Sequence, residues 1–199
     1  MEVQLGKSKI LFKKMFKIIK INLIFFLLIV MSFSNLYSGE KLINKLKKGE
    51  KIILIRHALA PGSGDPNNFD LNDCSTQRNL SIEGVEQSKK IGYFFSKNNI
   101  PIDEVLSSEW CRCKDTARYA FTRYKTFKPL NSFFSEKFQK NKDKQILELL
   151  KFLEKWNDKK NLILVTHYVV ILEITNQPVS SGEIIVLDKN LNLIGNIVL

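Results

Sequence analysis

Short, mostly apolar runs alternate along this chain with longer segments of helical periodicity. Three of these runs are typical of buried strands and occupy residues 51–55 (KIILI), 103–106 (DEVL) and 161–165 (NLILV). Two further strand-like runs, residues 183–187 and 193–199, close the chain around a turn. Because strands that alternate with helices form mostly parallel sheets covered on both faces, we expect an α/β fold with three layers, α/β/α.

The segments between the runs place apolar residues on one helical face. Helices are expected at residues 81–95, 109–124, 144–156 and 167–175. Ser81 is the expected N-cap of the first helix, because its hydroxyl can accept a hydrogen bond from a backbone N–H of the first turn. A loop rich in Pro, Gly, Asp and Asn is expected at residues 61–79, and an irregular link at residues 131–143.

Residues 1–38 have the layout of an export signal. A lysine-rich stretch that ends at Lys20 is followed by an apolar run at residues 21–33 and then by small polar residues. The apolar run is shorter than the roughly 20 residues of a membrane-spanning helix. This favours a signal peptide, with an uncleaved N-terminal membrane anchor as the alternative. Residues 39–199 are then one domain, periplasmic or anchored to the inner membrane.

The chain carries a net charge of +11. An excess of this sign favours anionic partners, such as a phosphorylated small molecule or a phosphoprotein, or an anionic membrane surface. The sequence has no basic stripe interleaved with aromatic residues and no nucleic-acid-binding motif, so nucleic acid is not expected as a partner.

The chain has only two histidines, and each follows a predicted strand. His57 ends the run KIILIRH, and His167 ends the run NLILVTH. Either one alone could be a structural histidine near a strand end. Because ligands of parallel α/β sheets bind at the carboxyl ends of the strands, the pair favours a shared active site at that edge.

Two arginines are expected at the same edge. Arg56 directly precedes His57, and Arg112 lies where the chain leaves the run at residues 103–106 and enters a helix. Guanidinium groups bind phosphate oxygens through paired donors, and a neutral imidazole can attack phosphorus. A second, protonated histidine can stabilise the charge of the phosphoryl group in transfer. The set predicts a phosphate pocket with a nucleophile in it.

Four segments resemble, in family order, motifs of the histidine phosphatase superfamily, which includes the cofactor-dependent phosphoglycerate mutases. They are residues 54–58 (LIRHA), 78–84 (RNLSIEG), 106–117 (LSSEWCRCKDTA) and 165–167 (VTH). The resemblance implies a phosphoglycerate mutase-like fold and a metal-independent phosphatase without a cofactor. It implies His57 as the nucleophile, His167 as the charge-stabilising partner, and Arg56 and Arg112 as phosphate clamps. Arg78 matches a further family position and is either a substrate contact or a structural residue.

The chain departs from that family in two places. Ala58 stands where the family usually has glycine. The general acid has no clear counterpart, because Tyr168 follows His167 where one branch has aspartate. Glu136 falls in the region where the other branch has its acidic glutamate, and it is the first candidate. The rival candidates are carboxylates of the loop after the nucleophile: Asp65, Asp70 and Asp73.

The three cysteines are Cys74, Cys111 and Cys113. An exported protein can form disulfides. A bridge from Cys74 to Cys111 or to Cys113 would hold the loop against the arginine segment, and Cys111 is the preferred partner. The cysteine spacing matches no standard zinc motif, and two arginines in one pocket oppose a cation, so no metal is expected. No Cys-x5-Arg loop of a cysteine-dependent phosphatase is present.

These observations predict an exported phosphatase that hydrolyses phosphate monoesters, or phosphohistidine, through a phosphohistidine intermediate on His57. The alternative is a non-catalytic phosphate-binding envelope protein that retains the pocket, and the missing acid is its main support. The short link at residues 131–143 leaves little room for a cap domain, so we expect a fairly open pocket.

Overall fold

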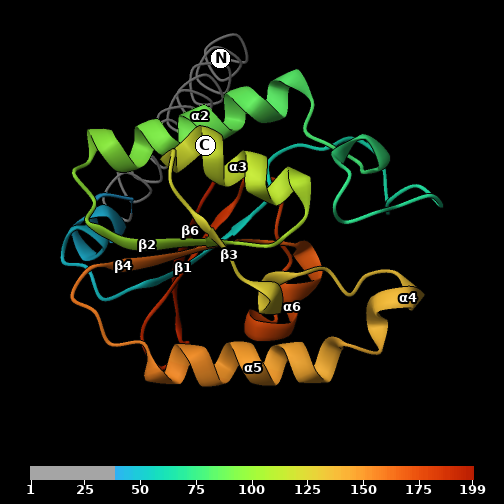
Figure 1. Cartoon of the computed structure of the whole chain (residues 1–199). Coiled ribbons are helices and arrows are strands. Elements are labelled where there is room, and N and C mark those ends of the chain that lie inside the picture. The colour runs from blue at the N-terminus through green and yellow to red at the C-terminus, as the bar shows by residue number, and fades with distance from the viewer. Residues whose placement is uncertain (1–38) are drawn as a thin grey trace, which may run out of the picture. The chain divides into compact units, whose positions relative to one another are not determined.

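Six strands form one sheet in the computed structural model of this chain, which describes residues 39–199 (Figure 1). Their order across the sheet is β3-β2-β4-β1-β5-β6. The strands are β1 (Ile52–Arg56), β2 (Ile102–Ser107), β3 (Lys125–Thr126), β4 (Asn161–Thr166), β5 (Ile184–Leu187) and β6 (Leu193–Ile197). The first four in the spatial order are parallel, whereas β5 runs antiparallel to β1 and β6 antiparallel to β5.

Helices cover both faces of the sheet. In Figure 1, α2 (Ile82–Lys97) and α3 (Cys111–Phe121) lie on one face, and α5 (Lys142–Lys155) and α6 (Tyr168–Thr175) lie on the other. The short helices are η1 (Cys74–Thr76), η2 (Lys128–Leu130) and α4 (Glu136–Gln139). The predicted three-layer fold with a mostly parallel sheet is confirmed.

The two central strands explain why the sheet forms. Every residue of β4 is buried, and so are the first four residues of β1. Parallel strands covered on both faces have this continuous apolar pattern. Leu149 and Leu153 of α5 pack into the same core. Burying each Leu or Ile side chain contributes about 1.5–3 kcal/mol to the free energy of folding. This core stabilises β1 and β4, the two strands that end at His57 and His167.

Local features differ from the sequence prediction, among them the short helix η1 inside the loop predicted at residues 61–79. The link predicted to be irregular at residues 131–143 contains the one-turn helix α4. The edge strand β3 was not predicted, because its two residues are exposed and carry no apolar pattern. The N-cap of α2 is as predicted, since Ser81 Oγ accepts a hydrogen bond from Gly84 N at 3.2 Å.

The predicted signal or anchor, residues 1–38, lies outside the described residues. Within residues 39–199, no helix combines the length and the apolar character needed to cross a bilayer.

Candidate active site

Three parallel strands end at one edge of the sheet, and the chain leaves each of them through a polar residue. Arg56 of β1 is paired with Thr166 of β4. Just beyond the strands, His57 N donates to Thr166 O at 2.9 Å, and Ser108 N donates to Val165 O at 2.9 Å. These backbone bonds bring His57 and His167 to one place, with their ring centroids 5.5 Å apart.

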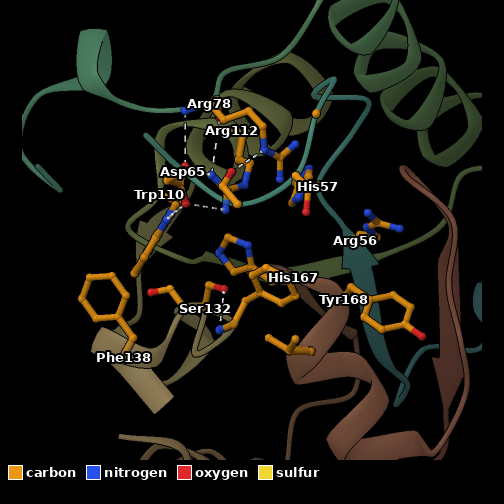
Figure 2. Close-up of a pocket in the computed structure, with 16 residues that line it drawn as sticks. Arg56, His57, Asp65, Arg78, Trp110, Arg112, Ser132, Phe138, His167 and Tyr168 are labelled. Atoms are coloured by element: carbon orange, nitrogen blue, oxygen red, sulfur yellow. Dashed lines mark hydrogen bonds and ion pairs between the residues drawn. The ribbon is translucent and has the colours of Figure 1, made fainter. Parts of the chain in front are cut away.

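A cavity of about 170 Å³ opens at this edge (Figure 2). Its charged and imidazole lining residues are Arg56, His57, Asp65, Arg78, Arg112 and His167. Apolar side chains and serines complete the wall: Trp110, Phe134, Phe138, Tyr168, Val169, Ser63, Ser132 and Ser135. The structure thus brings together five of the six residues that the sequence nominated for catalysis or substrate binding.

His57 is held as a neutral imidazole with one free nitrogen. The residue is 3% exposed, and its Nδ1 lies 2.8 Å from Ala58 O. A carbonyl only accepts, so Nδ1 carries the hydrogen and Nε2 keeps its lone pair. Burial, and then the charge of Arg112, lower the pKa of His57 to about 3. His57 therefore has the protonation state of a nucleophile throughout the neutral pH range.

His167 is neutral too, with the opposite tautomer. Its Nε2 lies 2.9 Å from Ser108 Oγ. Ser108 gives its single hydrogen to Asn131 Oδ1, so His167 Nε2–H donates to Ser108 and Nδ1 keeps the lone pair. Burial, and then Arg112, lower the pKa of His167 well below its ordinary value. The protonated form that we expected from the sequence is therefore disfavoured by the surroundings of His167. A bound phosphate dianion would favour a proton on Nδ1.

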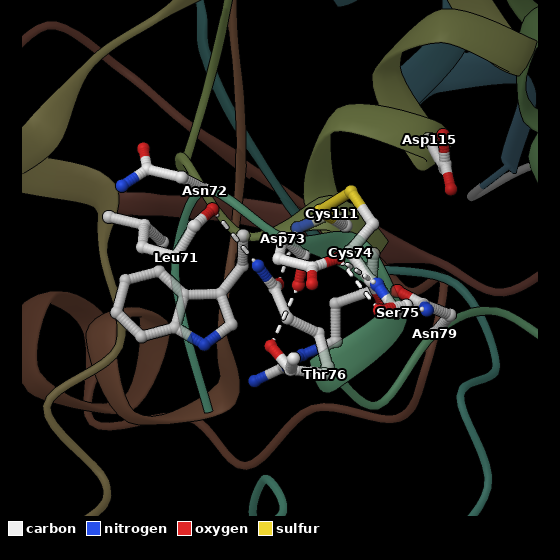
Figure 3. Close-up of a disulfide and its surroundings, with 12 residues drawn as sticks. Leu71, Asn72, Asp73, Cys74, Ser75, Thr76, Asn79, Cys111 and Asp115 are labelled. Atoms are coloured by element: carbon white, nitrogen blue, oxygen red, sulfur yellow. Dashed lines mark hydrogen bonds between the residues drawn. A yellow bond between two sulfur atoms is a disulfide. The ribbon is translucent and has the colours of Figure 1, made fainter. Parts of the chain in front are cut away.

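The loop that follows His57 is joined to the start of α3 by a disulfide between Cys74 and Cys111 (Figure 3). This is the pairing that we preferred from the sequence. Cys113 is a buried free thiol, 3.4 Å from His167 Nε2. Burial raises the pKa of Cys113 to about 12, so it packs as a thiol rather than reacting as a thiolate.

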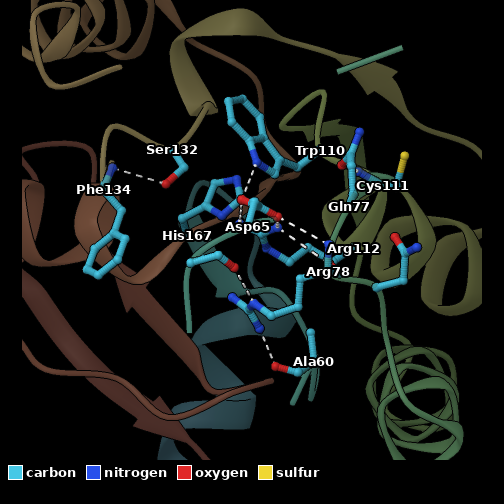
Figure 4. A network of polar contacts seen from close by, with 12 residues as sticks. Ala60, Asp65, Gln77, Arg78, Trp110, Cys111, Arg112, Ser132, Phe134 and His167 are labelled. Carbon is cyan, nitrogen blue, oxygen red and sulfur yellow. Dashed lines mark hydrogen bonds and ion pairs between the residues drawn. The ribbon is translucent and has the colours of Figure 1, made fainter. Parts of the chain in front are cut away.

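The same loop carries the partner of Arg112 (Figure 4). Asp65 Oδ1 accepts from Arg112 Nη1 at 2.6 Å, and Asp65 Oδ2 accepts from Arg112 Nη2 at 3.2 Å. The Arg112 side chain is only 4% exposed. Gly64, with φ +67°, gives the loop a left-handed turn that a residue with a Cβ rarely adopts, directly before Asp65. In the described part of the chain, Arg112 Nε is buried without a hydrogen-bond partner.

The two other arginines are anchored to backbone carbonyls. Arg56 Nη1 donates to Val179 O at 2.8 Å, and Arg56 Nε, like that of Arg112, has no partner among the described residues. Arg78 Nε donates to Gly64 O at 2.7 Å, and its Nη1 donates to Ala60 O. Arg78 therefore holds the loop and lines the pocket at once, which combines the two roles that the sequence left open.

Glu136 is the candidate that the structure leaves outside the cavity. It is exposed at the first turn of α4, and its neighbour Ser135 lines the pocket instead. Asp70 and Asp73 are exposed in the outer part of the loop, where Asp73 caps η1. Asp65 is the single carboxylate among the described lining residues. Residues 39–199 contain no cluster of three His, Cys, Asp or Glu side chains that could hold a metal ion.

The sequence analysis did not predict the residues that hold the lining side chains in place. The pairing of Asp65 with Arg112 was not predicted, and no role was predicted for Ser108 or Trp110. Trp110 Nε1 donates to Asp65 Oδ2 at 3.0 Å, and its ring meets that of His167 at 5.4 Å. Their place in the sequence could have indicated these roles, because Ser108 and Trp110 lie within four residues of Arg112 at the end of a predicted strand.

Ala58 is accommodated by an ordinary backbone. It has no positive φ, it is fully buried, and its N–H donates to Thr116 Oγ1 at 2.9 Å. Glycine at this position is therefore not required by the local conformation. Glycine is required close by at Gly84, because a Cβ there would lie 2.1 Å from Leu59 O.

Comparison with known proteins rests on structure alone. No protein-family model matches the chain, and no curated protein is similar to it in sequence. Many solved structures are similar. One is the protein histidine phosphatase SixA complexed with tungstate (TM-score 0.55, 14% identity), where the match covers 74% of this chain and 96% of that one. Another is TTHB049 from Thermus thermophilus (TM-score 0.54, 14% identity, 75% and 99% covered).

A phosphoserine phosphatase from Entamoeba histolytica is also similar, with a TM-score of 0.50 and 18% identity over 68% of this chain and 89% of that one. At identities this low, the structural matches show the fold alone, and the activity has to be argued from the site. The motifs that resemble the histidine phosphatase superfamily thus lie on that superfamily's fold, and the chain has the phosphoglycerate mutase-like architecture of the histidine phosphatases.

Proposed function

We propose that this protein is a phosphatase that hydrolyses phosphate monoesters, or phosphohistidine, through a phosphohistidine intermediate on His57. The observation that carries the proposal is the state of His57. Its Nδ1–H is tied to Ala58 O, its lowered pKa keeps it neutral, and its Nε2 is left with a free lone pair in a cavity lined by three guanidinium groups.

The reaction has two steps. His57 Nε2 attacks phosphorus, the bond from phosphorus to the leaving group breaks, and the leaving group takes up a proton from water. Water then attacks the phosphohistidine, which releases phosphate and restores His57. The unpaired Nε groups of Arg56 and Arg112 provide donors for phosphoryl oxygens, and His167 adds an N–H once its Nδ1 is protonated.

The absence of a free acid from the described pocket lining bears on the substrate. Asp65 is bound to Arg112 and Glu136 lies outside the cavity. Substrates whose leaving group needs little protonation, such as aryl phosphates and phosphohistidine, are therefore the preferred ones. One similar structure is that of a protein histidine phosphatase, which fits this preference, and another is that of a phosphoserine phosphatase, which does not.

We also propose that the protein is exported, either cleaved after the signal or anchored by it. The layout of residues 1–38 supports this, and so does the Cys74–Cys111 disulfide, which needs an oxidising compartment to persist.

The test is turnover of p-nitrophenyl phosphate by the full chain in detergent, with EDTA present, beside the His57→Ala variant. The proposal predicts turnover that survives EDTA and falls at least about 1000-fold in the variant. Phosphate binding without turnover of p-nitrophenyl phosphate or phosphohistidine would favour the alternative, a phosphate-binding envelope protein that retains the pocket. Turnover that persists in His57→Ala would refute the assigned nucleophile.

A further inference from the structure

Asp65 is surrounded by donors on both of its carboxylate oxygens. Oδ1 accepts from Arg112 Nη1 and from the Arg78 backbone N–H at 3.2 Å. Oδ2 accepts from Arg112 Nη2 and from Trp110 Nε1. The side chain is 17% exposed. Four donors leave this carboxylate little freedom to rotate, although the loop that carries it contains no strand.

The ion pair determines which edge of the Arg112 guanidinium remains available. A guanidinium has five N–H groups in one plane, and Asp65 takes the two that point forward from Nη1 and Nη2. The second Nη1 hydrogen faces Arg78 O at 3.4 Å. What remains is Nε–H and the outer hydrogen of Nη2, which run parallel. Nε is buried and has no partner in the described residues, so this edge suits two oxygens of one phosphoryl group.

Arg112 would not keep this orientation unaided. Arg56 and Arg78 line the same cavity, and the charge of Arg112 opposes the charge of each. Without a counter-charge, we expect the guanidinium to turn away from its two neighbours. Asp65 supplies that counter-charge along the Nη1–Nη2 edge, which adjoins the free Nε–Nη2 edge at Nη2.

We propose that Asp65 is a positioning residue, which holds Arg112 so that its Nε–Nη2 edge binds the phosphoryl group, and that it is not the proton donor of the reaction. This inference rests on the proposed phosphate pocket. Protonating either oxygen of Asp65 would break a bond from Arg112 or Trp110. Burial raises the pKa of Asp65, but the hydrogen bonds and charge of Arg112 outweigh it and keep the pKa below its usual range.

If Asp65 positions Arg112, removing its charge should change phosphate affinity in the opposite direction from a purely electrostatic effect. Asp65 is a negative charge close to the phosphate position, so removing its charge would strengthen phosphate binding if only Coulomb energy mattered. If Asp65 orients Arg112, the same substitution weakens binding, because the guanidinium no longer presents its paired donors. The side-chain amide of Asn has nearly the shape of the carboxylate, so Asp65→Asn separates the two effects.

The experiment is calorimetric titration of the full chain in detergent with inorganic phosphate. Asp65→Asn is expected to weaken phosphate binding about 10-fold to 100-fold. Trp110→Phe, which removes one donor to Asp65 but leaves the ion pair, is expected to weaken it less and in the same direction. Asp73→Asn is the matched control on the same loop and should bind like the wild type. Equal or tighter binding by a folded Asp65→Asn protein would overturn the proposal.

Two further results would separate this proposal from the one on which it rests. If Asp65 were the acid, Asp65→Asn would lower kcat far more for an alkyl phosphate than for p-nitrophenyl phosphate and would leave phosphate affinity unchanged, which overturns positioning. If the wild type binds phosphate without turnover, the proposed activity fails while the titration still tests Asp65. A wild-type protein that binds no phosphate overturns both proposals.

Discussion

The proposed phosphate pocket has two walls of different construction. The strand-end wall consists of Arg56, His57 and His167, and backbone hydrogen bonds of the parallel strands place it. The loop wall consists of residues 61–79, which form no regular strand. A disulfide and side-chain bonds to backbone carbonyls hold this wall in place, including those of Arg78.

The difference separates two properties of the site. His57 owes its position to the sheet, because its backbone N–H donates to Thr166 O, and it owes its tautomer to the carbonyl of its neighbour Ala58. The orientation of Arg112 depends on Asp65, and therefore on the loop. Substitutions in the loop wall should weaken anion binding and leave the reactivity of His57 intact. Substitutions in the strand-end wall should abolish the proposed phosphoryl transfer.

Acid should affect the two walls in different pH ranges, and this is the largest effect that we expect. The pKa of His57 is lowered from 6.5 to about 3, and that of His167 is lowered as well, so below pH 6.5 the unfolded chain binds protons that the folded chain does not. Stability should fall from pH 6.5 downward, by at most about 1.4 kcal/mol per pH unit for each histidine.

The loop wall should lose stability only at lower pH. The pKa of Asp65 is lowered from 3.8, so its contribution to the unfolding free energy is present above that pH and is lost only below it. Urea unfolding between pH 7 and pH 3 measures both ranges. His57→Gln should reduce the slope between pH 6.5 and 4.5, and Asp65→Asn should leave it unchanged. The same slope in His57→Gln and the wild type would contradict the assignment.

Removal of the disulfide comes next. The bridge closes a loop with a sequence separation of 37, so the Cys74→Ser, Cys111→Ser double variant should lose about 4 kcal/mol of unfolding free energy. Phosphate affinity should fall with it, because the loop wall loosens around Asp65. Dithiothreitol should destabilise the wild type by a similar amount and leave the double variant unchanged; equal sensitivity of the two would contradict the bridge.

Gly84→Ala tests the close approach between the start of α2 and the chain that follows His57. The new Cβ would lie 2.1 Å from Leu59 O. We expect a loss of about 2 kcal/mol, since the backbone has to shift. Gly39→Ala is the control, because a Cβ at Gly39 meets nothing within 4 Å. Similar thermal unfolding of the two variants would show that the close approach is not needed.

Ala58→Gly should have the smallest effect. Ala58 has an ordinary φ, so glycine relieves no strain there and adds freedom to the unfolded chain. A loss of about 0.5–1 kcal/mol is expected, with turnover within a few-fold of the wild type. A gain in stability would show that the alanine is strained.

The strand-end wall was largely predictable from the sequence. A buried parallel strand is visible in the sequence as a continuous apolar run, and ligands bind at the carboxyl ends of such strands. The position of His57 and His167 at that edge could therefore be predicted from the sequence. Their tautomers could not, because these depend on Ala58 O and Ser108 Oγ, which only the folded backbone brings within reach.

The loop wall was predictable only in part. Its composition indicated a loop, and Cys111 was preferred for Cys74, but the pairing of Asp65 with Arg112 spans 47 residues of chain and follows no periodicity. Glu136 illustrates the same limit. Its distance along the sequence suited a general acid, but a single turn of helix directs Ser135 and Phe138 to the cavity in its place.

The central claim is that His57 becomes phosphorylated. The most direct test is rapid quenching of the full chain in base after mixing with a phosphohistidine or aryl phosphate substrate, followed by mass spectrometry of the peptide that holds His57. The account predicts an acid-labile phosphoryl group on His57 in the wild type and in Asp65→Asn, and none in His57→Ala. A phosphorylated residue other than His57, or turnover without any phosphorylated protein, would contradict it.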